Sequence, residues 1–258
     1  MNKKPIHNFH IPVMGLSYTI DSPIRVAQYG ISSVVSIIDD EILEKMSQFY
    51  SKKFHFSYEG IAKKIEDSRA KRITAYLDMM DDIVGQKFDS FKEELAKSKS
   101  TLQDYISMLP SSSEIKSGLQ TILQNAKEDF SNSVKSFVDK HLHPGEIDVN
   151  IMTKVDKDNY EKHEQLPVIY NDAHASLRGF ALSKLTSSLV LSAGMNPRLY
   201  SYIEAFDDFY PDEEGNIKKK IILKVSDYRS AIIQGNFLAK KGIWVSEYRI
   251  ESGLNCGG

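Results

Sequence analysis

The C-terminal stretch from Lys219 to Gly258, KKIILKVSDYRSAIIQGNFLAKKGIWVSEYRIESGLNCGG, decides the predicted fold. Within it, Ile221-Ile222-Leu223 is a continuous apolar run, which is typical of a strand covered on both faces. Apolar residues then recur at the spacing of a helix, at Tyr228, Ala231, Ile232, Gly235, Leu238 and Ala239. The stretch therefore begins with a strand and continues into a helix.

The ends of this helix also carry sequence signals. Ser226 or Asp227 can cap its start, and Gly242 supplies the stop, because glycine takes a left-handed residue without strain. Ile243-Trp244-Val245 opens a second strand, and the glycine-rich segment 252–258 follows it. Such a turn after a parallel strand lets backbone N–H groups approach a ligand closely. We predict a strand–helix–strand unit with a ligand-binding turn at its end.

Further strand signals precede this unit along the chain. Short apolar or β-branched runs occur at 11–15, 33–38, 147–152 and 188–192. Helical patterns separate most of them, so that six strands alternate with helices. Alternation of this kind predicts an α/β fold with a parallel sheet.

The region between the second and third strands has a different character. From residue 39 to 142 the strand signals disappear, and apolar residues recur at helical spacing on both sides of Pro110. We predict an insertion of two or three helices packed as a hairpin. The barrel-like part is then 1–38 with 143–258, and the insertion is 39–142. The apolar helix faces are expected to form a core, or else an interaction surface such as a homo-oligomer contact.

Two architectures fit this alternation, an open doubly wound sheet and a (β/α)₈ TIM barrel. The chain has no G-x-G-x-x-G after its first strand, which lowers the dinucleotide-binding version of the open sheet. Outside the insertion lie roughly 155 residues, enough for about six βα units, whereas a whole barrel takes roughly 250. We therefore predict an incomplete TIM barrel with a long helical insertion between strands 2 and 3.

Composition narrows the class of protein. A net charge of -2 without a basic stripe argues against a nucleic-acid partner. One cysteine excludes an internal disulfide and a cysteine-built zinc site. No apolar run approaches the roughly 18 residues of a membrane span, and the N-terminus lacks the apolar core of a secretory signal. We expect a cytoplasmic protein that binds a small molecule.

Several strand ends together resemble one enzyme family. The motifs are Ile11-Pro12-Val13-Met14-Gly15, Val149-Asn150, Val190 to Pro197, Lys224-Val225 with Ala239 to Gly242, and Ser252 to Gly258. In order and spacing they are similar to the FMN-dependent barrels of the nitronate monooxygenase (2-nitropropane dioxygenase) type. The sixth motif departs from the family pattern, since Ser252 stands for its glutamine and Asn255 for its glutamate. The resemblance excludes the helical insertion.

The resemblance implies an FMN-dependent oxidoreductase that oxidises a small organic substrate after abstraction of its α-proton. The implied FMN-binding residues are Met14, Gly15, Asn150, Lys224, Ser252, Gly253, Gly257 and Gly258. Asn150 would hydrogen-bond the flavin, and Lys224 would place positive charge beside it. The family's catalytic histidine would follow Gly258, so the resemblance implies that this chain is an N-terminal portion whose catalytic residue is unknown.

Alternative readings remain open. Cys256 could serve another phosphate-binding TIM-barrel enzyme as a nucleophile, but at the position of a family alanine a packed small residue is favoured. His141 and His143 are two residues apart at a helix end and do not share a face, so we expect no metal site. A non-catalytic scaffold, whose helical insertion binds a partner, is the alternative outside enzymes.

Overall fold

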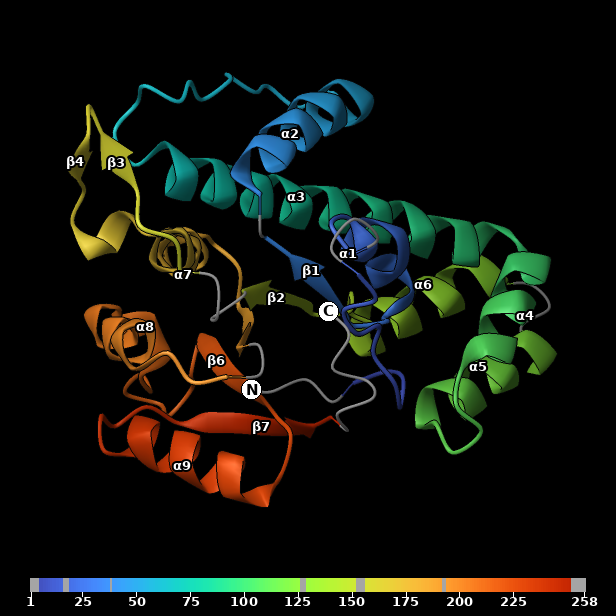
Figure 1. Ribbon diagram of the computed structural model, residues 1–258. Coiled ribbons are helices and arrows are strands. Elements are labelled where there is room, and N and C mark those ends of the chain that lie inside the picture. The colour runs from blue at the N-terminus through green and yellow to red at the C-terminus, as the bar shows by residue number, and fades with distance from the viewer. Residues whose placement is uncertain are drawn as a thin grey trace. The chain divides into compact units, whose positions relative to one another are not determined.

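The computed structural model describes residues 5–15, 19–37, 39–125, 129–151, 156–191 and 194–251 (Figure 1). The chain divides into two compact units, one formed by 1–12, 21–34 and 80–147 and the other by 13–20, 35–79 and 148–258. The predicted insertion 39–142 is shared between them, because the division falls inside one long helix. The first is called the helical unit and the second the sheet unit.

A five-stranded parallel sheet confirms the α/β class (Figure 1). Its order follows the chain: β1 (Ser33–Ser36), β2 (Ile147–Ile151), β5 (Ser187–Leu191), β6 (Lys219–Val225) and β7 (Val245–Ile250). Helices α7 (Asp172–Leu182), α8 (Pro197–Tyr202) and α9 (Tyr228–Ala239) connect β2 to β7 in turn. Right-handed crossovers in an order that never reverses put these helices on one face of the sheet.

The first predicted strand is wrong within the described residues. Ile11 makes only an isolated parallel bridge with Ser33, and no strand covers 12–15. Pro12 has no N–H to give to a ladder, and Gly15 has a φ of 130° that extended strand residues do not adopt. The segment therefore touches the edge of β1 without joining it.

The insertion holds more helices than the two or three predicted. They are α2 (Asp40–Phe54), α3 (Ser68–Lys97), α4 (Lys99–Met108), α5 (Glu114–Asn125) and α6 (Phe130–His141). The additional helix boundaries hardly interrupt the helical spacing of the apolar residues, so this spacing did not predict them. Ser98 is extended and caps α4 through the Thr101 N–H, and His55 ends α2 in the left-handed conformation.

Shorter elements complete the described chain: α1 (Ser22–Val26), η1 (Ala27–Tyr29), the hairpin of β3 (Tyr160–Glu161) with β4 (Glu164–Gln165), η2 (Val168–Tyr170), η3 (Ile203–Ala205) and η4 (Asp207–Phe209). None of the helices in the described ranges is both long and apolar enough to cross a membrane.

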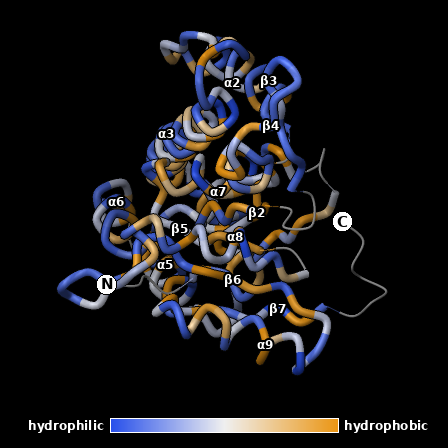
Figure 2. Tube along the Cα trace, turned by 60° about the vertical axis from the view of Figure 1, so that its left-hand side comes forward, coloured by the Kyte–Doolittle hydropathy of each residue, from blue (hydrophilic) through white to orange (hydrophobic). Residues whose placement is uncertain are grey.

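Each unit has its own core. In the helical unit, the apolar stripes of α4, α5 and α6 and the second half of α3 pack together around Leu95, Leu102, Leu119, Val134 and Val138, which are 0% exposed. In the sheet unit, the apolar residues lie along the strands, and β2 and β6 follow the hydrophobic part of the trace (Figure 2).

The two faces of the sheet differ in chemistry. Val149, Leu189 and Ile221 are register partners on the face covered by helices, which we call the helix face. Tyr248 lies on this face too, because its hydroxyl reaches Gly235 of α9. The alternate residues form the opposite face, which we call the polar face because it carries Asp148, Asn150, Ser188, Lys220, Lys224, Glu247 and Arg249. Because side chains alternate along a strand, the register alone assigns each residue to its face.

Candidate functional site

Asn150 is the buried polar residue at the carboxyl end of β2. Its side chain is 3% exposed, and Oδ1 has no hydrogen-bond partner among the described residues. Its backbone carbonyl accepts the Ile37 N–H at 3.3 Å, so the strand itself is paired. A buried acceptor without a donor costs about 1–3 kcal/mol in a folded protein. Asn150 is therefore placed to receive a donor from a ligand.

Lys224 lies on the same polar face, on β6. Its Nζ is 3.1 Å from Glu251 Oε1, and its side chain is 16% exposed. Arg249 of β7 is its register partner. The positive charge predicted at Lys224 is thus matched by a carboxylate that follows the last residue of β7.

Arg249 forms another ion pair on the polar face, and this pair reaches across the sheet. Its Nη2 lies 3.2 Å from Oδ2 of Asp148, a residue of β2 that is 3% exposed. β5 and β6 lie between these two strands, so a flat sheet would hold them about 14 Å apart. Burial opposes the charge of Arg249, but Glu247 and Asp148 raise its pKa. The pair requires the sheet to curl toward its polar face.

Gly15 and Met14 have different surroundings. The Gly15 carbonyl accepts the Thr19 hydroxyl at 2.9 Å, and that hydroxyl also lies 3.0 Å from Oγ of Ser36 at the end of β1. Thr19 and Ser36 are buried, whereas Met14 is 62% exposed. The sequence pattern identified Gly15 but gave no signal for this hydroxyl pair.

The remaining predicted ligands, Ser252, Gly253, Gly257 and Gly258, lie outside the described residues, as does Cys256. The predicted ligand-binding turn at 252–258 therefore stays a prediction.

The helix N-termini at the carboxyl ends of the strands do not form a phosphate cradle. The first N–H groups of α2, α8 and α9 are bonded by the helices' own caps, Asp39, Asn196 and Asp227. Two of these caps are carboxylates, which repel an anion. The part of FMN that fits the described residues is the ring, through Asn150, while the capped N-termini of α2, α8 and α9 offer no place for its phosphate.

Asp156 is a residue that the sequence patterns did not single out. It lies between β2 and α7, and its Oδ2 is 2.9 Å from Nδ1 of His174, which is 2% exposed. Burial opposes its ionisation, but His174, the Ala173 N–H and Asn196 together lower the pKa of Asp156. His174 stands two residues after the first residue of α7, a position with no periodic or motif signal.

Metal-ligating residues do not cluster in the described parts of the chain, where no group of three His, Cys, Asp or Glu side chains could hold an ion. The His141 ring stacks on Phe137 with centroids 4.5 Å apart, and His143 Nδ1 lies 3.0 Å from the Pro144 carbonyl.

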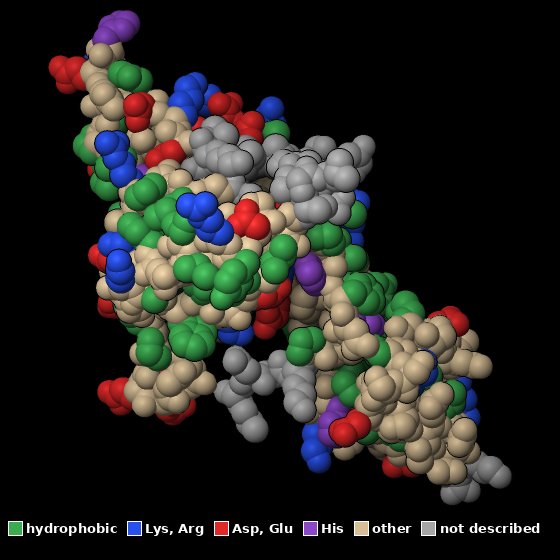
Figure 3. All heavy atoms as spheres, turned by 60° about the horizontal axis from the view of Figure 1, so that its bottom comes forward, with side chains coloured by type: hydrophobic (Ala, Val, Ile, Leu, Met, Phe, Trp, Pro, Cys, Tyr) green, Lys and Arg blue, Asp and Glu red, His purple; other side chains and the backbone are tan. Residues whose placement is uncertain are grey.

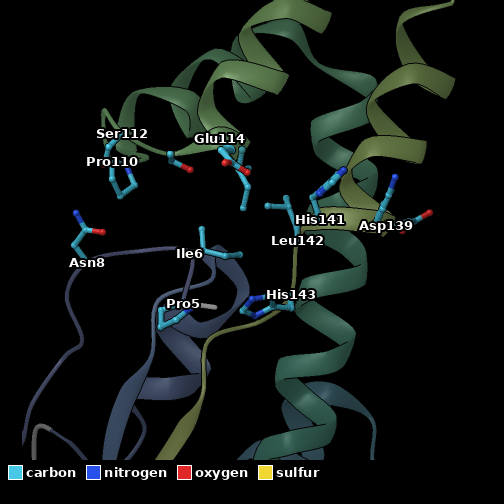
Figure 4. A pocket seen from close by; sticks show the side chains of 13 residues that line it. Pro5, Ile6, Asn8, Pro110, Ser112, Glu114, Asp139, His141, Leu142 and His143 are labelled. Atoms are coloured by element: carbon cyan, nitrogen blue, oxygen red, sulfur yellow. The ribbon is translucent and has the colours of Figure 1, made fainter. Parts of the chain in front are cut away.

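A surface hollow of about 510 Å³ lies in the helical unit (Figure 4). Ile6 and Leu142 form its buried apolar part, whereas the polar side chains around it are exposed, as Glu114 and His141 are, or half-buried, as His143 is. It has no buried polar group among its lining residues. The hollow therefore lacks the convergent polar contacts of a ligand site.

The polar face of the sheet is thus the best candidate site, with Asn150 at its centre. Comparison with known proteins adds no further assignment: the chain matches no protein-family model, no curated protein and no solved structure.

Proposed function

We propose that the chain is part of an FMN-dependent oxidoreductase of the nitronate monooxygenase-like class, built on a (β/α)₈ barrel. The unpaired buried Oδ1 of Asn150 carries the proposal. It lies at the carboxyl end of a parallel strand, where α/β enzymes bind their ligands. A flavin ring presents an N–H donor that such an acceptor would satisfy.

The barrel part of the proposal draws support from the sheet. The strands follow one another in chain order, whereas a doubly wound sheet reverses its order at a switch point. The Arg249–Asp148 pair draws β7 toward β2 across the polar face. Both features are expected when a parallel sheet curls toward closure.

In this proposal FMN supplies the electron chemistry, and the chain supplies binding and orientation. Asn150 fixes the ring through a hydrogen bond that exists only in the loaded protein. Lys224, balanced by Glu251, presents a cation beside the ring without adding a net charge. The substrate is a small organic molecule with an acidic C–H bond.

The test is the substitution Asn150→Leu, with FMN binding followed by quenching of flavin fluorescence. We expect wild-type protein to bind FMN and the variant to bind about tenfold to a hundredfold more weakly, because a buried hydrogen bond is lost. The free variant should unfold at an equal or higher urea concentration, since an unsatisfied acceptor has been removed. Asn132→Leu, in the exposed part of α6, is the matched control.

Wild-type protein that takes up no FMN would overturn the proposal. An Asn150→Leu variant with unchanged FMN affinity would show that Asn150 does not bind FMN. A variant that is destabilised would indicate that Asn150 serves the fold instead.

A further inference from the structure

Asp156 joins three elements at the carboxyl ends of β2 and β5. Its Oδ1 accepts the Ala173 N–H of α7 at 3.1 Å, and its Oδ2 lies 2.9 Å from His174 Nδ1. The same Oδ2 accepts a hydrogen bond from Asn196 Nδ2 at 3.4 Å. Asn196 in turn caps α8 through the Leu199 N–H at 3.1 Å. One carboxylate therefore connects the start of α7 to the start of α8.

The packing around His174 fixes its ring. The ring lies on Tyr202 with centroids 5.3 Å apart, and the Tyr202 hydroxyl accepts a hydrogen bond from Arg178 at 3.0 Å. Arg178 is held by Asp67 and by the Ile169 carbonyl. The imidazole is buried between the Tyr202 ring and the Asp156 carboxylate, so it has little room to turn. His174 therefore sets where the Asp156 carboxylate lies.

The elements that Asp156 connects flank the candidate site. Asp156 follows β2, the strand of Asn150, and Asn196 follows β5, the strand of Val190. Asn150 and Val190 are direct register partners. The Asp156–Asn196 hydrogen bond joins the segment after β2 to the segment after β5. It therefore fixes the chain around the carboxyl end of β2, where Asn150 lies.

We propose that Asp156, oriented by His174, is a positioning residue that holds the start of α8 against the start of α7 and so fixes the ligand-binding end of the β2–β5 pair. This inference rests on the proposed function for its ligand, the flavin ring, but its structural part can be tested without it. A residue of this kind touches no ligand; it acts through the placement of the segments that do.

The test compares substitutions that separate hydrogen bonding from packing. His174→Leu keeps a side chain of similar size but removes the polar contact with Asp156, whereas His174→Gln keeps a polar group beside the carboxylate. Asp156→Asn keeps the shape but loses the charge. Asp158→Asn is the matched control, because Asp158 lies in the same loop and contacts Asn171 at 2.7 Å instead of α8.

Two readouts are taken on the whole chain, hydrogen exchange of the 194–202 segment and FMN affinity. In His174→Leu and Asp156→Asn we expect exchange of this segment to rise about tenfold and the FMN Kd to rise about tenfold, the size of effect that the loss of one charged contact produces. His174→Gln should recover most of both, and Asp158→Asn should change neither.

The outcomes separate this inference from the proposed function. If wild-type protein binds no FMN, the proposed function fails, and the exchange data alone decide whether Asp156 holds α8. Unchanged exchange of 194–202 in Asp156→Asn overturns the inference. Equal loss in His174→Leu and His174→Gln also overturns it, because the effect would then come from packing and not from the polar contact with Asp156.

Discussion

The helical unit and the C-terminal βα part of the sheet unit differ in how many of their large apolar side chains are exposed. Among the described residues of 80–147, Met108, at 48%, is the only large hydrophobic residue that is exposed. In contrast, α9, β7 and the turn between them expose six, which we call the C-terminal apolar patch: Tyr228, Ile232, Ile233, Trp244, Tyr248 and Ile250. Figure 3, which brings this side forward, shows such side chains on the surface.

The difference follows from the geometry of the two kinds of structure. Helices satisfy their backbone internally and can bury their apolar stripes against the next helix along the chain. A parallel sheet leaves an open edge wherever the next strand is missing, and β7 is such an edge in the described part of the sheet. The homo-oligomer contact through the insertion stays a prediction: the insertion 39–142 exposes Ile42, Phe49, Ile65 and Met108, and the C-terminal apolar patch is a second exposed apolar surface.

The largest expected effect tests burial directly. Leu102, in α4, is 0% exposed, and Leu102→Ala should destabilise the protein by about 2–5 kcal/mol through lost transfer energy and a cavity. Ile250 is 71% exposed, so Ile250→Ala should change stability by no more than about 0.5 kcal/mol. Urea unfolding followed by circular dichroism compares the two. Similar losses in both variants would contradict the contrast between the regions.

A second effect concerns self-association. The C-terminal apolar patch and the open edge of β7 should make the wild-type chain associate and bind an apolar dye. Ile232→Lys combined with Ile250→Lys should lower dye fluorescence about twofold and shift the chain toward monomer in sedimentation. Ile42→Lys, on an exposed site of α2, is the control. A wild-type chain that is monomeric, binds no dye and unfolds cooperatively would refute the prediction.

The smallest effect is a pH dependence in the helical unit. The buried His7 ring lies with Nε2 3.0 Å from the Tyr29 carbonyl, and burial lowers its pKa below the usual 6.5. The folded state therefore favours the neutral ring. Its contribution is complete above about pH 6.5 and is lost as the pH falls from that value toward the lowered pKa of the folded state, because the unfolded chain takes up the proton first.

The measurement is the urea midpoint between pH 7.5 and pH 5 for wild type and His7→Gln, which stays neutral throughout. Wild-type stability should fall more steeply with acid than that of the variant. Parallel curves for the two proteins would show that the burial of His7 carries no such pH dependence.

Local sequence signals predicted much of the sheet unit. Strand segments were expected at 147–152 and 188–192, and they occur at Ile147–Ile151 and Ser187–Leu191. Asn196 caps α8 with Pro197 at its first position, Asp227 caps α9, and Gly242 takes a φ of 74°. Each of these depends on residues next to one another in the chain, so the pattern alone was sufficient.

Features that depend on distant pairs left no signal. Lys219 was predicted as part of a strand, yet its ammonium group is fully buried and donates to the Phe180 and Ser183 carbonyls at 3.0 and 2.8 Å. Asp156 and His174 looked like ordinary loop and helix residues. Their roles arise only when α7 is folded against the sheet.

The sequence by itself determined most of the strands, the helical character of the insertion, where several elements begin and end, and that Asn150 stands at the end of a buried strand. These properties follow from local hydrogen bonding and from the period of apolar residues. Only the tertiary structure decided which polar groups meet. The Arg249–Asp148 pair joins residues 101 positions apart, and the Asp156–Asn196 bond joins residues 40 apart. Such contacts depend on strand order and sheet curvature, which short-range patterns do not encode.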